Sequence, residues 1–399
     1  MQTSHREKIS AAAEGHSFAR LGIIGGGQLA KMTAQAALQL GCEVVVLDRE
    51  KHSPAAQLAT RSLVGDWDDP QELLKLASQV DVVTIENEFL NPDALAVIEN
   101  AGRKLYPNIA TLRRVQDKLI QKQILNQCGL PTTHFAEVSS VEDVIKFGTE
   151  YGWPVVLKTR RNGYDGKGNF TIHAVDEVAL AWRALAGAGN AVYVEAFCPY
   201  TRELATIVTR SALGSVVVYP VVETVQRNHI CHLVRAPAQI LTGIAQTAAS
   251  FALRAIEAIE GIGSFGVEMF LTNSDQVLIN ELAPRVHNSG HYSIEACVCS
   301  QFENHVRAVM GWPLGSTAMV SSSAAMVNLL GSRKGSGAPM GMAHALGITG
   351  AHIHVYGKAM TSAGRKMGHI TALGDNIDSA ENIARRAADW IDFGDENED

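Results

Sequence analysis

Two acidic side chains flank a short polar turn in the stretch FGVEMFLTNSDQVLINEL. A β-hairpin symmetric about positions 274 and 275 places Glu268 directly opposite Glu281. The same register pairs Phe270 with Ile279. Two carboxylates that face each other across a ladder repel. A divalent cation relieves that repulsion, and Mg²⁺ suits the site because it takes oxygen ligands and bridges substrate phosphates. In the alternative register, shifted by one residue, the two acids point to opposite faces.

A glycine-rich loop with several cations follows the apolar run WPVVLKT, which ends near Lys158. The loop combines flexible glycines with positive side chains, namely Gly163, Gly166, Gly168, Arg160, Arg161 and Lys167. A strand follows it and not a helix, which excludes the P-loop of nucleoside triphosphatases. Backbone N–H groups and a lysine in such a loop can still close over phosphates as a lid. The alternative is an ordinary solvated hairpin loop.

Two further loops are dense in hydrogen-bond donors. The first, LAPRVHNSGHYS, contains Arg285, His287, Asn288 and Ser289. The second, GRKMGH, offers Arg365, Lys366 and His369 in a predicted tight turn. Arginine forks match the geometry of phosphates and carboxylates, so both loops are candidate anion sites. For the second loop, a solvated basic turn is an equal alternative.

A third glycine motif lies near the N-terminus, where Gly25, Gly27 and Ala30 form G-x-G-x-x-A between a predicted strand and a predicted helix. Asp48 follows about twenty residues later, as in dinucleotide-binding folds. Taken alone, this motif suggests an NAD-dependent oxidoreductase. Many βα turns carry the same pattern without binding a dinucleotide.

The elements that position these residues change character along the chain. From residue 21 the pattern is strand, helix, strand, which predicts a parallel sheet flanked by helices. A helical stretch is predicted over residues 113–129. Strand-rich segments with short connections follow, and short connections favour antiparallel pairing. We expect the following divisions: an extension (1–20), a Rossmann-like domain (21–112), a second domain (113–315, with subdomains 113–192 and 193–315), a C-terminal domain (316–391) and an acidic tail (392–399).

Composition limits the class of protein. The 399 residues carry 34 Lys and Arg against 41 Asp and Glu, a net charge of −7. An acidic chain argues against nucleic acid or an anionic membrane as the main partner. No apolar run is long enough to span a membrane. Six scattered cysteines are typical of a reducing compartment and not of a disulfide framework. These features predict a cytoplasmic, multidomain enzyme.

The motifs together resemble the ATP-grasp superfamily, and within it the 5-(carboxyamino)imidazole ribonucleotide synthases. The matching stretches occur in the family's order: GGGQLAKM, TIENE, QDKLIQKQIL, YDGKGN, VYVEAF with RELA, FGVEMF, INELAPRVHNSGHYS, MVNLLG and GRKMGH. They cover about residues 21–374. The resemblance implies an ATP-grasp fold with an N-terminal Rossmann-like (pre-ATP-grasp) parallel-sheet domain and a small C-terminal β-rich domain.

The resemblance also implies an activity. Family members carboxylate the exocyclic amine of aminoimidazole ribonucleotide with ATP and bicarbonate, through carboxyphosphate, in purine biosynthesis. We therefore expect Mg²⁺ as the metal, a homodimer as the assembly, and a separate carboxyaminoimidazole ribonucleotide mutase as the pathway partner, because the chain ends too early for the fused mutase domain of some members.

Roles for individual residues come from the same resemblance. The implied ATP-binding residues are Lys118, Lys158, Gly163, Tyr164, Asp165, Gly166, Lys167, Gly168, Asn169, Glu195, Ala196, Phe197, Cys198, Glu203, Gln226, Asn280 and Glu281. The implied substrate-binding residues are Gly25, Gly27, Gln28, Leu29, Glu86, Tyr164, Asp165, Lys167, Arg285, His287, Asn288, Ser289, Lys358, Arg365 and Lys366. The implied catalytic residues are Lys158, Asp165, Lys167 and Arg285, and the implied metal ligands are Glu268 and Glu281. The glycine turn at 25–27 would then face the substrate's phosphate and not a dinucleotide.

The chain departs from the family pattern at two places. Gln226 stands where many members carry a histidine near ATP, and we expect it to tune binding without abolishing it. The stretch KAMTSAGRK lacks the family's usual Arg-Pro pair, so that Lys358 or Arg365 would compensate for a missing phosphate ligand.

Three other functions are weighed against this one. A formate-using glycinamide ribonucleotide transformylase, or another ATP-grasp carboxylase, shares the fold but is disfavoured by the HNSGHY run. An NAD-dependent dehydrogenase leaves the two opposed glutamates without a role. A non-catalytic nucleotide-binding protein would be consistent with the two departures.

Overall fold

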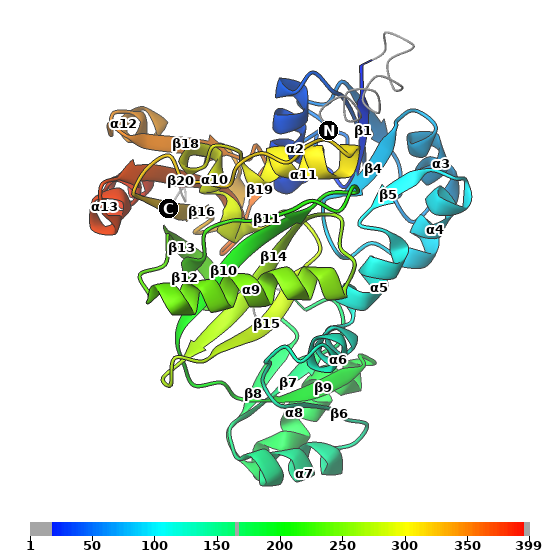
Figure 1. The fold of residues 1–399 in the computed structure, drawn as a ribbon, viewed down its shortest axis with the longest axis vertical. Coiled ribbons are helices and arrows are strands. Elements are labelled where there is room, and N and C mark those ends of the chain that lie inside the picture. The colour runs from blue at the N-terminus through cyan, green and yellow to red at the C-terminus, as the bar shows by residue number, and fades with distance from the viewer. Residues whose placement is uncertain (1–17, 164–166, 395–399) are drawn as a thin grey trace, which may run out of the picture.

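A five-stranded, all-parallel sheet forms the N-terminal part of the computed structural model, which describes residues 18–163 and 167–394 (Figure 1). Its strand order is β3-β2-β1-β4-β5. The strands are β1 (Arg20–Ile24), β2 (Glu43–Asp48), β3 (Arg61–Val64), β4 (Val82–Ile85) and β5 (Lys104–Tyr106). The helices are α2 (Gln28–Gln39), α3 (Pro70–Ala77) and α4 (Pro92–Asn100).

The residues of this sheet explain its parallel arrangement. β1, β2 and β4 are buried almost throughout, as expected where helices cover both faces. Helix α3 begins with Pro70 in its first turn, and Asp69 caps it by accepting from the N–H of Gln71. Because parallel strands end at one edge, the turn after β1 and the loop after β4 meet there. The predicted parallel, helix-flanked sheet is confirmed.

The helical stretch predicted over 113–129 is wrong as a single element. The structure has α5 (Ile109–Gln116) and α6 (Lys118–Gln127), separated at Asp117, whose backbone is extended. The Asp117 carboxylate accepts from the N–H groups of Leu119 and Ile120. Asp117 thus caps the second helix, a function that its side chain favours over a position inside a helix.

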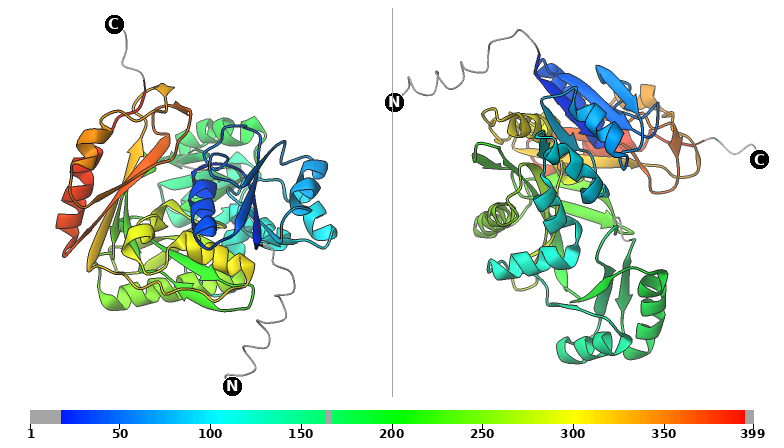
Figure 2. Two further views of the ribbon diagram at one scale, coloured as in Figure 1. Left: turned by 90° about the horizontal axis from the view of Figure 1, so that it is seen from above. Right: turned by 90° about the vertical axis from the view of Figure 1, so that its right-hand side faces the viewer.

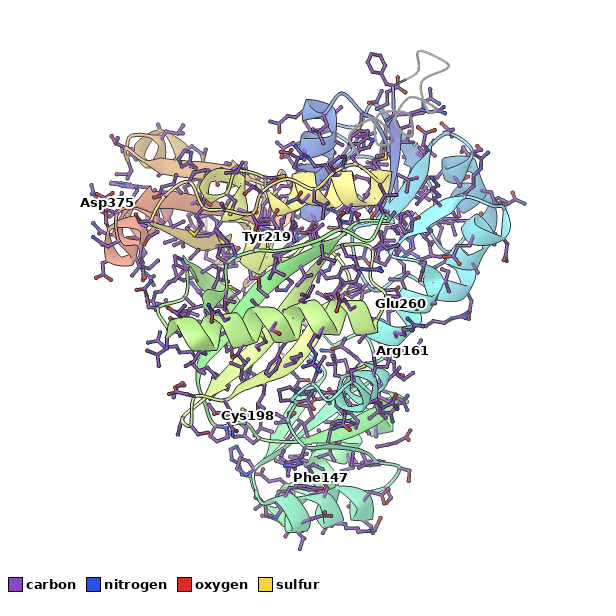
Figure 3. The ribbon with its side chains drawn as sticks, in the orientation of Figure 1. Phe147, Arg161, Cys198, Tyr219, Glu260 and Asp375 are labelled. Carbon is purple, nitrogen blue, oxygen red and sulfur yellow. The ribbon has the colours of Figure 1, made fainter. Side chains whose placement is uncertain are left out.

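A four-stranded antiparallel sheet, order β6-β9-β7-β8, lies at one end of the molecule and is covered by two helices (Figure 2). Its strands are β6 (Phe135–Glu137), β7 (Val155–Thr159), β8 (Asn169–Ile172) and β9 (Val192–Ala196). The covering helices are α7 (Val141–Tyr151) and α8 (Val178–Leu185), and Phe147 of α7 marks the end far from the other sheets (Figure 3). This small sheet carries the glycine loop and Lys158.

A nine-stranded antiparallel sheet joins the centre of the molecule to its C-terminal part. Its order is β15-β14-β10-β12-β13-β16-β20-β18, with β11 paired to β10. The strands are β10 (Tyr200–Arg210), β11 (Val216–Val218), β12 (Val222–Arg227), β13 (Ile230–Ala236), β14 (Gly263–Thr272), β15 (Val277–Ala283), β16 (Ser323–Leu330), β18 (Ala351–Val355) and β20 (Lys366–Gly374). Because β13 pairs with β16, the sheet is continuous across position 316. The predicted antiparallel pairing is confirmed.

Helices cover both faces of this long sheet. Helix α9 (Thr242–Ala258) packs on β10, β14 and β15, as Figure 1 shows. Helix α11 (Gln301–Met310) packs between β14 and α2, and so joins the central sheet to the parallel sheet. Helix α13 (Ile377–Ala388) covers β16 and β20. The remaining short elements are β17 (Gly335–Ser336), β19 (Met360–Thr361), α10 (Ser293–Ala296) and α12 (Met342–Leu346).

The tight turn predicted for GRKMGH is wrong. Strand β20 begins at Lys366, so His369 lies within the sheet, fully buried, and only Arg365 and the residues before it form the loop. All six cysteines are free thiols. None of the helices in the described part of the chain is long and apolar enough to cross a membrane.

Candidate active site

The hairpin of β14 and β15 sets Glu268 directly opposite Glu281, as predicted. The predicted partner of Phe270 is wrong, because Phe270 pairs with Leu278 and not with Ile279. A β-bulge causes the shift: Asn280 is an extra residue between the two paired segments. Its side-chain oxygen is buried without a hydrogen-bond partner among the described residues. Three oxygen-bearing side chains therefore gather on adjoining positions of one hairpin.

Each glutamate of this pair already contacts a cation or a histidine. The Lys118 ammonium lies 2.5 Å from Oε2 of Glu281. Nε2 of His287 lies 3.3 Å from Oε1 of Glu268. Burial raises the pKa of Glu281. Lys118 and the other cationic neighbours together lower it by more, so the pKa lies below its usual value. Glu281 is therefore ionised at neutral pH and available as an anionic ligand.

The same face of the central sheet carries Glu203. It pairs with Phe270 across the β10–β14 ladder, two positions from the pair of Ala205 with Glu268. Tyr200 donates its hydroxyl to Glu203 at 2.6 Å and stacks on Phe270 with a ring separation of 4.6 Å. Burial raises the pKa of Glu203, and side-chain hydrogen bonds from Tyr200 and Gln226 oppose that rise. Gln226 thus contacts the carboxylate that we expect to bind ribose.

Lys158, at the end of β7, lies beside Glu195 on the neighbouring strand β9. Their charged atoms are 3.2 Å apart. In the stretch formed by Glu195, Ala196, Phe197 and Cys198, the side chains of Glu195 and Cys198 are buried, whereas the Phe197 side chain is exposed. Cys198 lies where the small sheet meets the nine-stranded sheet (Figure 3).

The glycine loop begins close to Lys118, the other lysine that we predicted to bind ATP. A Cβ on Gly163 would lie 3.9 Å from Nζ of Lys118. Gly168 has a φ of +82°, and its carbonyl accepts from the N–H of Thr159, while Asn169 pairs with Lys158 across the β7–β8 ladder. Three predicted loop residues lie outside the described residues, namely Tyr164, Asp165 and Gly166.

Arg285 reaches across to the parallel sheet, where it forms a two-point ion pair with Glu88. Nε binds Oε2, and Nη2 lies 2.7 Å from Oε1. Burial raises the pKa of Glu88, whereas the charge and hydrogen bond of Arg285 lower it. The second effect is larger, so the pKa of Glu88 lies below its usual value. Our sequence reasoning did not include Glu88, although the TIENE motif contains both it and Glu86.

Glu86 fills the turn formed by the N-terminal glycines. Its Oε1 would lie 2.3 Å from a Cβ on Gly27, and its carboxylate accepts from the N–H of Leu29 at the start of α2. Burial raises the pKa of Glu86 above its usual value. A carboxylate thus occupies the helix N-terminus where we expected the substrate's phosphate. Asp48 accepts from Gly26 at 2.5 Å, so this acid anchors the turn.

The C-terminal loops bring cations toward the same edge of the parallel sheet. Lys358 lowers the pKa of Glu86 and donates to the carbonyl of Lys366 at 2.7 Å. Lys31 of α2, which our sequence reasoning missed, donates to the carbonyls of Val355 and Tyr356 at 3.1 and 3.0 Å. Arg365 is exposed and donates to the carbonyl of Met360. Lys358 therefore lies near Glu86, whereas Arg365 points to solvent.

Two residues of the HNSGH loop hold other residues in place. Asn288 exchanges amide hydrogen bonds with Asn328 of β16, at 2.9 and 2.7 Å. The Ser289 hydroxyl lies 2.8 Å from Nδ1 of His287 and is buried. That contact orients the His287 ring, whose other nitrogen lies beside Glu268. Predicted substrate contacts of Asn288 and Ser289 stay predictions.

Sequence families match most of the chain. Residues 18–116 match the ribonucleotide synthetase pre-ATP-grasp domain, residues 123–302 the ATP-grasp domain, and residues 324–383 the phosphoribosylaminoimidazole carboxylase C-terminal domain. The first match covers the parallel sheet, the second covers strands β6 to β15, and the third covers β18, β20 and nearly all of β16.

Relatives over nearly the whole chain include proteins of two lengths. The N5-carboxyaminoimidazole ribonucleotide synthase of Synechococcus elongatus is 40% identical over 352 residues, which are 88% of each chain. The phosphoribosylaminoimidazole carboxylase of Schizosaccharomyces pombe is 41% identical over 368 residues, 90% of this chain but 66% of that protein. The chain thus spans slightly less than two thirds of the second relative.

Solved structures give the same result. The N5-carboxyaminoimidazole ribonucleotide synthetase of Thermotoga maritima superposes with a TM-score of 0.86 at 39% identity, covering 95% of this chain and all of the other. An Aspergillus clavatus N5-carboxyaminoimidazole synthase, solved with ADP and 5-aminoimidazole ribonucleotide, superposes with a TM-score of 0.85 at 35% identity, covering 94% and 98%. Both similarities extend over nearly the whole chain.

Proposed function

The chain belongs to the N5-carboxyaminoimidazole ribonucleotide synthases, a family of ATP-grasp ligases, and from that premise we propose that it carboxylates 5-aminoimidazole ribonucleotide with ATP and bicarbonate in purine biosynthesis. The observation that carries the proposal is the opposed pair of Glu268 and Glu281, together with the ion pair between Lys118 and Glu281. It forms a set of charges fitted to a magnesium nucleotide. The dehydrogenase hypothesis gives this set no function.

The residues present fit Mg²⁺. Glu268, Glu281 and the unpartnered oxygen of Asn280 supply oxygen ligands, and the Lys118 ammonium shows that Glu281 accepts a cation at 2.5 Å. No cluster of three His, Cys, Asp or Glu side chains forms a complete metal site in the described part of the chain. An ion held here would therefore complete its shell with nucleotide phosphates and water. Mg²⁺, when bound, would neutralise charge on the transferring phosphoryl group.

The cations of the chain would act on the same phosphates. Lys118 and Lys158 are each held by a carboxylate in this structure and would turn to the nucleotide, while Glu203 would take the ribose hydroxyls. Lys167 would join them, which is supported by Gly163, since a Cβ there would lie 3.1 Å from the Lys167 carbonyl oxygen and 3.9 Å from Nζ of Lys118. Closure of the loop would exclude water. A dry site matters because carboxyphosphate hydrolyses readily.

The nucleotide substrate would lie at the edge of the parallel sheet. Glu86 in the glycine turn is a hydrogen-bond acceptor, and a phosphate beside it would be repelled. We therefore propose that Glu86 faces the uncharged part of aminoimidazole ribonucleotide. Its phosphate would bind toward Lys358, Lys366 and Arg365, and Arg285 would contact the carboxyphosphate.

The proposed reaction has two steps. An oxygen of bicarbonate attacks the γ-phosphorus of ATP, the bond to the bridging oxygen breaks, and ADP and carboxyphosphate form. The amine nitrogen then attacks the carboxyl carbon, the bond from that carbon to the phosphate oxygen breaks, and phosphate leaves. A base takes the amine proton, and Asp165 is the proposed base. The protein supplies chiefly positioning and charge.

The experiment that tests the proposal measures ADP release with Mg·ATP, bicarbonate and aminoimidazole ribonucleotide, with each omitted in turn. We expect release only in the complete mixture. ADP release that does not depend on the imidazole nucleotide would make the substrate assignment wrong, and replacement of bicarbonate by formate would indicate a transformylase. We also propose a homodimer, testable by light scattering, and a carboxyaminoimidazole ribonucleotide mutase as the enzyme that consumes the product.

A further inference from the structure

We infer that Lys122 is a positioning residue for ATP binding. It neutralises the Glu195 carboxylate, so that Lys158 can turn its ammonium group to the nucleotide phosphates. The inference rests on the proposed function, because it takes Lys158 as a phosphate ligand. Lys122 lies on α6 and is only 2% exposed, so that its ammonium group is shielded from solvent. It would therefore act only through its neighbours.

Glu195 accepts from four donors, two on each oxygen. Oε1 takes the Tyr193 hydroxyl at 2.7 Å and faces Nζ of Lys122 at 3.4 Å. Oε2 takes the Thr133 hydroxyl at 2.8 Å and Nζ of Lys158 at 3.2 Å. Four donors match the lone-pair capacity of a carboxylate. If Lys158 leaves, three donors remain, and Glu195 is not left unsatisfied.

The charge of this group of residues favours the departure of Lys158. Two lysine side chains face one carboxylate, and the charge of Glu195 opposes the fall in the pKa of Lys122 that burial causes. A buried carboxylate with a single counter-ion would hold that ion firmly, because separation leaves an uncompensated buried charge. With Lys122 in place, Glu195 stays paired after Lys158 has moved. Burial raises the pKa of Glu195, yet the two lysines bring it well below its usual value.

The two lysines differ in reach and in restraint. Lys158 is 13% exposed and lies at the strand end beside the glycine loop. Lys122 is also held by the Thr133 hydroxyl at 3.2 Å and by the carbonyl of Ile279 at 3.5 Å. Ile279 lies two positions before Glu281 on β15. Lys122 is therefore fixed between the small sheet and the hairpin of β14 and β15, and Lys158 is the lysine able to move.

The test compares ATP with adenosine, which shares the base and ribose but lacks phosphates. In Lys122→Met, Lys158 becomes the only counter-ion of Glu195, and we expect the Kd of ATP to rise about 10-fold while the Kd of adenosine is unchanged. In the double variant K122M/E195Q, the carboxylate charge is also gone, and the Kd of ATP should return to within about 3-fold of wild type. Lys146→Met, an exposed lysine on α7, is the matched control.

Calorimetric titrations of the full chain separate the outcomes. Equal weakening of ATP and adenosine, or a double variant no better than K122M, would show a purely structural ion pair and overturn the inference. If K122M does not fold, Glu195→Gln alone decides: Lys158 is then free of its carboxylate, and ATP should bind at least as tightly as to wild type. Weaker ATP binding with unchanged adenosine binding would overturn the inference. Failure of the wild-type chain to bind ATP would instead remove the proposed function.

Discussion

Glu268 and Glu281 lie directly opposite each other on the β14–β15 ladder, and Lys118 lies 2.5 Å from the second of them. The lysine relieves a repulsion that the sheet geometry would otherwise impose. If the proposed Mg²⁺ binds here, it would relieve the same repulsion and would leave Lys118 able to turn toward the phosphates. The proposed function would thus link metal binding to the position of Lys118.

Glu281→Gln tests that link. The change removes an anionic ligand and the partner of Lys118, so we expect turnover to fall at least about 100-fold and the Mg²⁺ concentration for half-maximal activity to rise. Steady-state ADP release across a Mg²⁺ titration measures both. Glu257→Gln, on the exposed face of α9, is the control and should behave as wild type. Near-normal turnover of E281Q would make the metal assignment wrong.

Gly27→Ala tests the position of Glu86. A Cβ at residue 27 would lie 2.3 Å from Oε1 of Glu86, so the carboxylate must move. We expect KM for aminoimidazole ribonucleotide to rise about 10-fold or more, with KM for ATP unchanged, because the atoms nearest to the new Cβ all belong to Glu86 and not to the lysines proposed to bind ATP. Gly243→Ala, where a Cβ meets nothing within 4 Å, is the control. An equal rise in both KM values would contradict the separation of the two subsites.

Glu88→Gln tests the role of the ion pair with Arg285. The amide cannot accept both N–H groups of the fork as an anion does, so Arg285 loses its fixed orientation. We expect kcat/KM for the imidazole nucleotide to fall about 10- to 100-fold. The matched control is Asp93→Asn, which breaks the exposed pair with Arg113. Kinetics indistinguishable from wild type would mean that Arg285 needs no such support.

The environment of His305 predicts an acid-sensitive region where α11 meets β14 of the nine-stranded sheet and β4 of the parallel sheet. Its Nδ1 accepts from the N–H of Ser264, and its Nε2 lies 2.8 Å from the Thr84 hydroxyl, which donates to a carbonyl. A proton on Nδ1 would meet the N–H of Ser264, and burial lowers the pKa of His305 to about 4. In the unfolded chain the imidazole takes up its proton near pH 6.5.

Acidification should therefore favour the unfolded state. Between about pH 6.5 and pH 4 the unfolded chain binds this proton and the folded chain does not, so stability falls as the pH falls. For His305 alone we expect about 2 kcal/mol less unfolding free energy at about pH 5 than at about pH 7.5. Urea unfolding measures it. His305→Asn should reduce the pH dependence by that amount, whereas exposed His52→Asn should not. An unchanged dependence in H305N would contradict the assignment.

The sequence indicated those features that depend on neighbours along the chain. Alternation of strands and helices predicted the parallel sheet, and a symmetric turn predicted the pairing of Glu268 with Glu281. Such features are local, so that residue type and spacing specify them. The same local reasoning failed at Asn280, because a bulge depends on what the neighbouring strands require. It failed at Asp117 too, since nothing in the helical pattern marks a capping residue within it.

Only the tertiary structure decided which charged groups neutralise each other. Arg285 meets Glu88 across 197 positions of the chain, Lys118 meets Glu281 across 163, and Lys122 shares Glu195 with Lys158. Sequence reasoning named most of these residues but assigned the cations to ligands, without the carboxylates that hold them. The physical reason is that a buried charge requires a counter-charge, and packing, not spacing, selects it. The amino-acid order thus indicated which residues to expect at the site, and the fold determined which of them form ion pairs with each other.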